Sequence, residues 1–367
     1  MAARIVVFGA TGYTGDLTAR ALVARGARPV LAARNEARVR ALAEELGDLE
    51  FALADVSRPE SVRALVERDD VLVSTVGPFT RWGGPAVEAA IAAGAHYLDS
   101  TGEGGFIRAV FERYGGGAQA AGCGLITAFG FDWVPGNLAG GLALRDAGPE
   151  ATRLEVGYFS PGAGAGSMSG GTRASAASVM LARGFAWRGG RLIDERPARH
   201  VRSFEVSPGK RWQAVSVPAS EHFTLPRVHP TLRDIAVYLG WFGPLSQPMS
   251  LLSGAVSAVT SLPGAREGLD ALFGRLVKGS TGGPDAAARA TSRSLVFAET
   301  FDASSSQLSS VRLEGPNGYE LTAEFLAWGA QTAAGGGLQG TGALGPVDAF
   351  GLDALEAGCA EAGLVRA

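Results

Sequence analysis

The first twenty-five residues constrain this chain most, because an apolar strand runs directly into three evenly spaced glycines and then a helix. Arg4–Phe8 has the apolar character of a buried strand, and Asp16–Arg25 has a helical pattern. Glycines between them permit a tight turn, close approach of backbone N–H groups to a pyrophosphate, and close packing of the helix on the strand. The positive end of the helix dipole then faces the anion.

The spacing of these glycines is not specific by itself. With 53 glycines in the chain, it also fits an ordinary turn, so the prediction of a dinucleotide site depends on the strand before the glycines and the helix after them. We expect a dinucleotide at Gly9, Thr11, Gly12, Tyr13, Thr14 and Gly15.

The end of the second strand, Pro29–Arg34, selects the cofactor. Enzymes that use NAD usually place an acid there to hold the ribose 2'-hydroxyl, whereas a guanidinium suits a 2'-phosphate. Arg34 therefore favours NADP(H); the alternative is a solvated arginine before a helix.

Asp55 follows the third expected strand, Leu49–Ala54. It is a candidate partner for the adenine amino group or a plain turn aspartate. The segment Ser57–Glu60 after it reads as a helix capping box.

Three further strands, Val71–Val76, His96–Asp99 and Gly124–Ala128, are each followed by a loop and a helical pattern. This alternation predicts an α/β fold with a Rossmann-type doubly wound parallel sheet, in which ligands lie beyond the carboxyl ends of the strands. Candidates to line the ribose and nicotinamide are Thr75, Val76, Gly77 and Pro78. Candidate catalytic residues, with turn or helix capping as the alternative for the acids, are Tyr97, Asp99, Thr101, Glu103 and Asp132. Phe79 and Phe131, in the same loops, are candidates for substrate contact.

From about Leu138 the alternation stops, which predicts a second α+β domain on a mixed sheet. Expected strands are Thr152–Phe159, Arg211–Val217, Arg293–Phe301 and Gln307–Leu313, with turn signals at Gly189–Gly190 and Pro316–Gly318. We expect residues 1–136 to form the NADP-binding domain, completed by a helical return over 345–367, and residues 137–344 to form a substrate or dimerisation domain. A helix start rich in small residues marks a candidate substrate site, or a tight cap, at Ser169, Gly170, Gly171, Thr172 and Arg173.

Composition excludes several classes of protein. A net charge of -3 gives no basic footprint for nucleic acid. The isolated Cys123 and Cys359 match no metal or disulfide spacing, and a strand at the N-terminus leaves no room for a signal peptide, so we expect a cytoplasmic protein without a metal. The apolar stretch Ile235–Pro263 is divided by Pro244 and Pro248, which argues against a membrane span and for core, dimer surface or a wall for a lipophilic substrate.

The chain also lacks the usual catalytic motifs. No tyrosine has a lysine four residues later, and neither H-E-x-x-H nor G-x-S-x-G occurs. What remains is hydride transfer, in which the cofactor carries the difficult step and the protein supplies orientation and a polar group.

The blocks GATGYTG, Arg34, VSTVGPFTRWGGP, YLDSTGE, GFDWVPGNL and SGGT together resemble the saccharopine dehydrogenase-like oxidoreductases, and more narrowly their bacterial trans-acting enoyl reductase branch. Trp133 and Gly136 depart from the small polar residues that relatives more often carry there. The resemblance implies an NADPH-dependent reductase of an enoyl-type substrate in lipid, polyketide or secondary metabolism, either a small molecule or an acyl group, free or carrier-bound. The assembly stays open, with a homodimer as one candidate. Two alternatives stay open: imine reduction joining an amino acid to an aldehyde, and a non-catalytic NADP-binding or lipid-associated protein.

Overall fold

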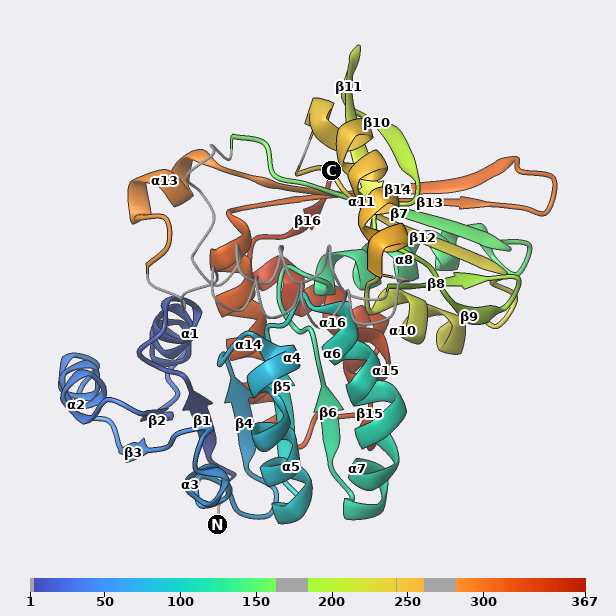
Figure 1. The fold of residues 1–367 in the computed structure, drawn as a ribbon. Coiled ribbons are helices and arrows are strands. Elements are labelled where there is room, and N and C mark those ends of the chain that lie inside the picture. The colour runs from blue at the N-terminus through green and yellow to red at the C-terminus, as the bar shows by residue number, and fades with distance from the viewer. Residues whose placement is uncertain (1–2, 163–183, 242, 261–281) are drawn as a thin grey trace. The chain divides into compact units, whose positions relative to one another are not determined.

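The computed structural model describes residues 3–162, 184–241, 243–260 and 282–367 (Figure 1). The chain forms two compact units. The first unit comprises Met1–Gly102, Phe106–Leu138 and Gly315–Val365, and the second comprises Glu103–Gly105, Ala139–Glu314 and Arg366–Ala367. The candidate substrate residues Ser169, Gly170, Gly171, Thr172 and Arg173 lie outside the described residues.

The first unit is built on a seven-stranded sheet in the order β15-β6-β5-β4-β1-β2-β3, and every neighbouring pair is parallel. Its strands are β1 (Ile5–Phe8), β2 (Val30–Ala33), β3 (Phe51–Leu53), β4 (Val71–Ser74), β5 (His96–Asp99), β6 (Gly124–Ile126) and β15 (Gly342–Ala343). Chain order reverses between β1 and β4, so the switch point where doubly wound sheets bind ligands lies at the carboxyl ends of these two strands. The predicted Rossmann-type sheet is confirmed.

Helices cover both faces of this sheet, as its buried strands require (Figure 1). One apolar core includes Val6, Leu72, Tyr97 and Leu125. On the other face, Phe129 packs against Trp328 and Phe350 with ring centroids 6.3 and 5.3 Å away. The helices are α1 (Tyr13–Ala24), α2 (Glu36–Glu45), α3 (Pro59–Arg63), α4 (Phe79–Trp82), α5 (Gly84–Ala93), α6 (Gly104–Ala109), η1 (Val110–Tyr114), α7 (Gly115–Ala121), α14 (Gly318–Ala334), α15 (Pro346–Phe350) and α16 (Leu352–Glu361).

Two local predictions in this unit are wrong. Ser57 does not cap α3: the helix begins at Pro59 after Arg58, and the Ser57 hydroxyl donates to Asp55 Oδ1 at 2.8 Å. Proline at the first helical position needs no partner for its nitrogen, so the helix starts without a capping box. The segment Pro316–Gly318 does not turn between strands, because Asn317 caps the 17-residue helix α14 through the backbone N–H of Tyr319 at 2.8 Å.

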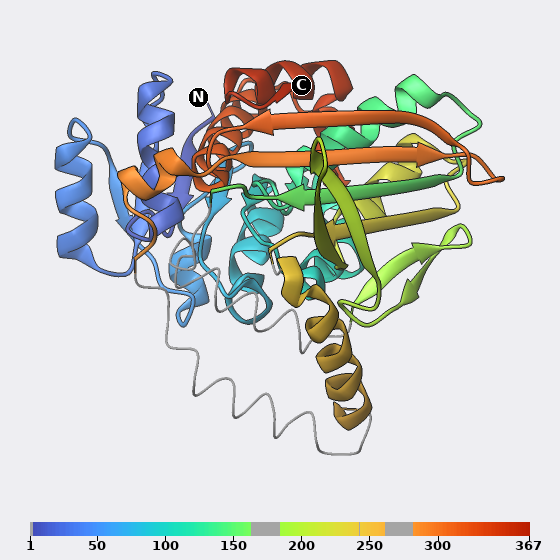
Figure 2. The ribbon, with the colours of Figure 1, turned by 90° about the horizontal axis from the view of Figure 1, so that it is seen from above.

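The second unit has a nine-stranded mixed sheet, which confirms the predicted architecture. Its main path runs β10-β11-β12-β7-β13-β14-β16, with β8 paired to β12 and β9; β12 and β7 are parallel, whereas β7 and β13 are antiparallel. Figure 2 shows the long strands β7, β13 and β14 side by side. The strands are β7 (Arg153–Phe159), β8 (Phe185–Arg188), β9 (Arg191–Asp194), β10 (Val201–Ser207), β11 (Lys210–Ser216), β12 (Asp234–Leu239), β13 (Ser294–Phe301), β14 (Gln307–Gly315) and β16 (Val365–Arg366).

The helices of the second part are α8 (Val134–Ala147), which leads into it, α10 (Glu221–Val228), η2 (Gly243–Leu245), α11 (Ser246–Thr260) and α13 (Ala286–Thr291). The apolar stretch that begins at Ile235 divides as its prolines predict, into strand β12 and helix α11. Within the described ranges, no helix has the length and apolar character to cross a bilayer.

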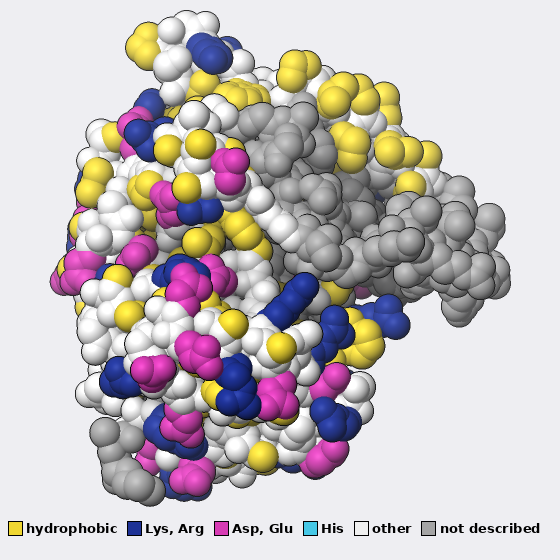
Figure 3. All heavy atoms as spheres, turned by 90° about the vertical axis from the view of Figure 1, so that its left-hand side faces the viewer, with side chains coloured by type: hydrophobic (Ala, Val, Ile, Leu, Met, Phe, Trp, Pro, Cys, Tyr) yellow, Lys and Arg dark blue, Asp and Glu magenta, His cyan; other side chains and the backbone are white. Residues whose placement is uncertain are grey.

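The surface of the first unit carries mixed charge. On α1 and α2, Arg20 pairs with Asp16 and Glu45 at 3.0 and 2.8 Å, and Arg40 pairs with Glu36 at 2.7 Å. Basic and acidic side chains alternate over the face drawn in Figure 3.

Candidate functional site

The glycine turn after β1 is a close-packed cradle. Gly9 has φ +91°, a conformation that favours glycine, and its N–H donates to Ala32 O at 2.9 Å. A Cβ on Gly15 would lie 2.2 Å from Gly9 O and 2.8 Å from Thr75 Oγ1. The glycine at position 15 is therefore required if α1 is to start this close to the carboxyl end of β4.

The amino end of α1 opens toward this turn. Its first intrahelical hydrogen bond runs from Asp16 N to Gly12 O at 2.8 Å, and its N-cap residue, Gly12, makes no side-chain capping bond. The backbone N–H groups of the first turn, at Tyr13, Thr14 and Gly15, precede that bond. Thr11 is half-buried and Gly12 is exposed. This arrangement of backbone donors and helix dipole fits a pyrophosphate.

Arg34 and Asp55 lie at the carboxyl ends of β2 and β3. Arg34 is exposed and directly precedes Asn35, whose side chain caps α2 by accepting from Arg38 N at 3.0 Å. Asp55 Oδ1 accepts from the Ser57 backbone N–H at 2.9 Å and from its hydroxyl. These bonds, with smaller effects of Arg34 and Arg58, lower the pKa of Asp55. Arg34 is thus presented to solvent at the place where a 2'-phosphate would lie in a Rossmann-type fold.

The loop after β4 meets the cradle through Thr75. The Thr75 hydroxyl donates to Phe8 O and Gly9 O at 3.2 and 3.3 Å. Val76 and Pro78 are half-buried, Gly77 is exposed, and the Gly77–Pro78 peptide is cis. Phe79, a predicted substrate contact, is buried in the core of the unit and packs on Phe106 with ring centroids 5.6 Å apart.

Asp99, at the end of β5, joins the loops after β5 and β6. Its Oδ1 accepts from Thr101 N and Ala128 N, both at 2.9 Å, and its Oδ2 accepts from the Thr127 hydroxyl at 2.8 Å. Ala128 has φ +60°, and the bond to Asp99 helps to hold it there. Burial raises the pKa of Asp99 to about 6, although the three bonds oppose the shift.

Three other predicted catalytic residues, Tyr97, Thr101 and Glu103, lie on β5 or in the residues that follow it. Tyr97 is fully buried, and burial together with the charge of Asp99 raises its pKa well above the usual value. Thr101 is buried and bonded to Asp99, as described above. Glu103 is buried as well, but its contacts group it with the second unit.

Asp132, in the loop after β6, differs from these residues. The residue is half-buried, yet its Oδ1 is enclosed and has no hydrogen-bond partner among the described residues. Desolvation raises the pKa of Asp132 to about 7. A Cβ on Gly102 would lie 3.0 Å from Asp132 Oδ2, so the loops after β5 and β6 touch at this carboxyl. The structure therefore holds a carboxylic acid that is half protonated near neutral pH at the ligand-binding edge of the sheet.

Tyr319 is a site residue that the sequence reasoning missed. Its ring packs edge-on against Tyr13 of the cradle, with centroids 5.1 Å apart and an interplanar angle of 87°. Tyr319 lies in the first turn of α14, more than three hundred residues from the cradle in sequence. The sequence does contain a signal for the start of this helix: Asn317 is a favoured N-cap residue and precedes an apolar helical run. Phe131, the other predicted substrate contact, is buried beside Gly318.

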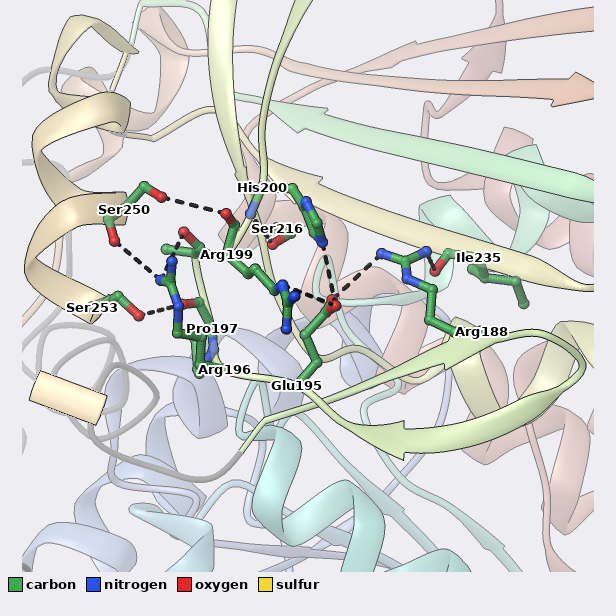
Figure 4. Close-up of polar contacts among 11 residues, drawn as sticks. Arg188, Glu195, Arg196, Pro197, Arg199, His200, Ser216, Ile235, Ser250 and Ser253 are labelled. Atoms are coloured by element: carbon green, nitrogen blue, oxygen red, sulfur yellow. Dashed lines mark hydrogen bonds and ion pairs between the residues drawn. The ribbon is translucent and has the colours of Figure 1, made fainter. Parts of the chain in front are cut away.

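The second unit contains a small, partly open hollow with charged residues in its lining. Glu195 contacts Arg188 Nη2 at 3.4 Å, Arg199 Nε at 3.8 Å and His200 Nε2 at 3.2 Å (Figure 4). Arg196 donates to Ser250 O at 3.0 Å. Arg188 and Arg199 thus both pair with Glu195, whereas Arg196 bonds to a backbone carbonyl, so arginines outnumber acids among these residues. Other lining residues are Phe185, Ala186, Ser216, Val217, Pro218, His222, Ala236 and Val237. Burial lowers the pKa of His222 to about 4, so this histidine is neutral near pH 7.

The described residues contain no group of three or more His, Cys, Asp or Glu side chains placed to hold a metal ion. The glycine cradle, the helix start and the exposed Arg34 instead match the phosphates of NADP(H). The residues present therefore fit this cofactor.

Comparison with known proteins agrees with that fit. The model of the saccharopine dehydrogenase NADP binding domain matches residues 5–115. A Mycobacterium tuberculosis protein whose name places it among the trans-acting enoyl reductases is 43% identical over 141 residues, which are 37% of this chain and 34% of that protein. A trans-acting enoyl reductase of Mycobacterium ulcerans is 38% identical over 154 residues, 40% of this chain and 37% of that one. The chain thus matches about a third of the length of these curated relatives.

Among solved structures, saccharopine dehydrogenase (L-Glu forming) from Saccharomyces cerevisiae has a TM-score of 0.61 at 13% identity, covering 100% of this chain and 99% of that one. At this identity the similarity concerns the fold alone. The resemblance to the saccharopine dehydrogenase-like oxidoreductases is confirmed: residues 5–115 match the NADP binding domain of saccharopine dehydrogenase, and the fold resembles that of a saccharopine dehydrogenase.

Proposed function

We propose that the protein is an NADPH-dependent reductase that saturates the activated C=C bond of an enoyl-type substrate. The observation that carries the proposal is Asp132, whose carboxyl has one enclosed oxygen and a pKa of about 7 and lies in the same unit as the NADP(H)-binding residues 5–115. The similarity to trans-acting enoyl reductases supports the choice of an enoyl group.

Each part of the chain has a role in this reaction. Gly9–Gly15 and the amino end of α1 bind the pyrophosphate, Arg34 binds the 2'-phosphate, and Thr75–Pro78 orient the nicotinamide ribose. When bound, NADPH supplies a hydride to the β-carbon of the enoyl group. Asp132 holds the proton that the resulting enolate takes up, so one hydride and one proton saturate the bond. The half-buried Asp132 is then reprotonated from solvent.

Other assignments complete the proposal. The cofactor domain comprises residues 1–136 and a C-terminal return that begins with α14, which lies in the first unit, rather than at residue 345. The rest of residues 137–344, with the mixed sheet of the second unit, forms the substrate and dimerisation domain. The protein acts in the cytoplasm as a homodimer on a lipophilic acyl substrate, free or carrier-bound. Ser169–Arg173 and Phe131 contact the substrate.

The experiment that tests the function measures NADPH oxidation with a panel of 2-enoyl thioesters of increasing chain length, with products identified by mass. We expect saturated products two mass units heavier and a strong preference for NADPH over NADH. Binding of NADPH without oxidation across enoyl, imine and carbonyl panels would contradict catalysis and favour a non-catalytic role.

The charged hollow supports a second candidate, imine reduction of a substrate that carries carboxylates. Such a substrate needs cationic partners, and Arg188, Arg196 and Arg199 together exceed the charge of Glu195. The test compares acidic and neutral substrates in the wild type and in Arg188→Gln. A rise in KM confined to acidic substrates would support this candidate, whereas equal KM values would exclude it.

A further inference from the structure

The first turn of α14 holds the loop that carries Asp132. The Thr322 hydroxyl accepts from the backbone N–H of Phe131 at 2.9 Å and donates to Gly318 O at 2.7 Å. Thr322 is 8% exposed, and the bond from Phe131 is buried. Phe131 is the residue directly before Asp132, and 191 positions separate it from Thr322.

Packing leaves this contact little freedom. A Cβ on Gly130 would lie 3.0 Å from Thr322 Cγ2, and a Cβ on Gly318 would lie 3.0 Å from Phe131 Cδ1. Loop and helix therefore fit closely on both sides of the hydrogen bond. Since Gly130 and Phe131 directly precede Asp132, their position limits where its carboxyl can lie.

The same helix turn is fixed to the cofactor cradle. Tyr319 packs edge-on against Tyr13, as described above. Farther along α14, Gln331 and Glu324 each accept from the guanidinium of Arg25, the residue that follows α1, at 3.1 Å. The α14 helix thus contacts both the cofactor cradle and the loop that carries Asp132, and it fixes the position of this loop relative to the cradle.

We propose that Thr322 is a positioning residue for the reductase: its hydroxyl, acting through the backbone of Phe131, holds the Asp132 carboxyl in register with the cofactor cradle. This inference rests on the proposed role of Asp132. It assigns to the C-terminal segment a part in the chemistry that the NADP-binding match over residues 5–115 does not include.

The test compares Thr322→Val, Thr322→Ser and Thr332→Val. Valine keeps the shape of threonine but removes the hydroxyl, whereas serine keeps it. Thr332 is the matched control, because its hydroxyl donates to Trp328 O at 2.8 Å within the same helix, as that of Thr322 does to Gly318 O. Three quantities are measured: kcat and KM with an enoyl thioester, the Kd for NADPH, and amide hydrogen exchange at Phe131.

We expect Thr322→Val to lower kcat by about tenfold, since a displaced catalytic group loses its alignment, and to leave KM and the NADPH Kd within about twofold. Exchange at Phe131 should accelerate, and Thr322→Ser and Thr332→Val should behave like the wild type. Wild-type kcat and Phe131 protection in Thr322→Val would overturn the inference, as would an equal loss of kcat in Thr332→Val. If the wild type oxidises no NADPH, the proposed function fails, and Phe131 exchange alone then decides whether Thr322 holds the loop.

Discussion

Replacing Gly15 by alanine tests the close packing of the cradle. The added Cβ would lie 2.2 Å from Gly9 O and 2.8 Å from both Gly9 C and Thr75 Oγ1. Backbone atoms cannot rotate away as a side chain does, so the glycine turn must separate from α1 by roughly 1 Å. Overpacking of this kind costs about 1–3 kcal/mol.

The displacement acts on the groups that bind the pyrophosphate. If the cofactor must restore the native turn when it binds, a cost of about 1–3 kcal/mol weakens binding by roughly 5- to 150-fold. The assay is fluorescence titration with NADPH, together with urea denaturation to measure the free energy of unfolding.

Gly116→Ala is the matched control. Gly116 is also a helical glycine, in α7, but an added Cβ there meets nothing within 4 Å. We expect wild-type NADPH affinity and a free energy of unfolding higher by about 0.5–1 kcal/mol, because alanine favours the helix. Wild-type affinity in Gly15→Ala, or equal weakening in both variants, would refute the reasoning.

Three more predictions concern single side chains. Arg34→Ala should weaken NADPH binding by about 10- to 100-fold, the value of a lost charge-assisted bond, and leave NADH binding within about threefold. The two affinities are measured by parallel titrations of the variant with NADPH and NADH, and an equal loss of affinity for both would contradict the prediction. Because Asp132 must be protonated to donate, kcat should be constant below pH about 7 and fall about tenfold per pH unit above it. Asp132→Asn should remove this dependence and lower kcat by about 10²- to 10⁴-fold, and an unchanged pH profile would exclude Asp132 as the donor. Asp99→Ala removes the hydrogen bonds that the buried N–H groups of Thr101 and Ala128 donate to Asp99 and should lower the free energy of unfolding by about 2–4 kcal/mol in urea denaturation; a change below about 0.5 kcal/mol would show that the network contributes little.

The sequence was sufficient to predict β1 to β6 of the first unit because their signals are local, whereas α14 and β15, which complete this unit, were not predicted. Apolar strands that end in glycine or an acid recur at regular intervals, and the parallel sheet has the expected strands. Local signals also misled at Ser57, where a serine three residues before Glu60 resembled a capping box. Pro59 instead begins the helix, and Ser57 bonds back to Asp55.

What the sequence could not reveal depends on contacts between distant segments. Tyr319 reaches Tyr13, and Thr322 reaches Phe131, only because α14 packs beside α1 and the loop after β6. In the second unit, β8 and β9 have only four residues each, and β10 carries Arg202 and Glu205 among its apolar residues. Their sequences therefore indicate a strand less clearly than that of β13. The difference between Asp99 and Asp132 is likewise invisible in sequence: both are acids after a strand, but Asp99 accepts three hydrogen bonds and Asp132 Oδ1 is enclosed without one.

The central claim is that the chain reduces an enoyl group with hydride from NADPH, and isotope transfer tests it most directly. The purified protein is incubated with a 2-enoyl thioester and NADPH deuterated at either the pro-R or the pro-S position of C4, and the product is analysed by mass. We predict one deuterium in the saturated product from one of the two labelled cofactors, bound at the β-carbon. Bound NADPH with no deuterium in any product would contradict the claim.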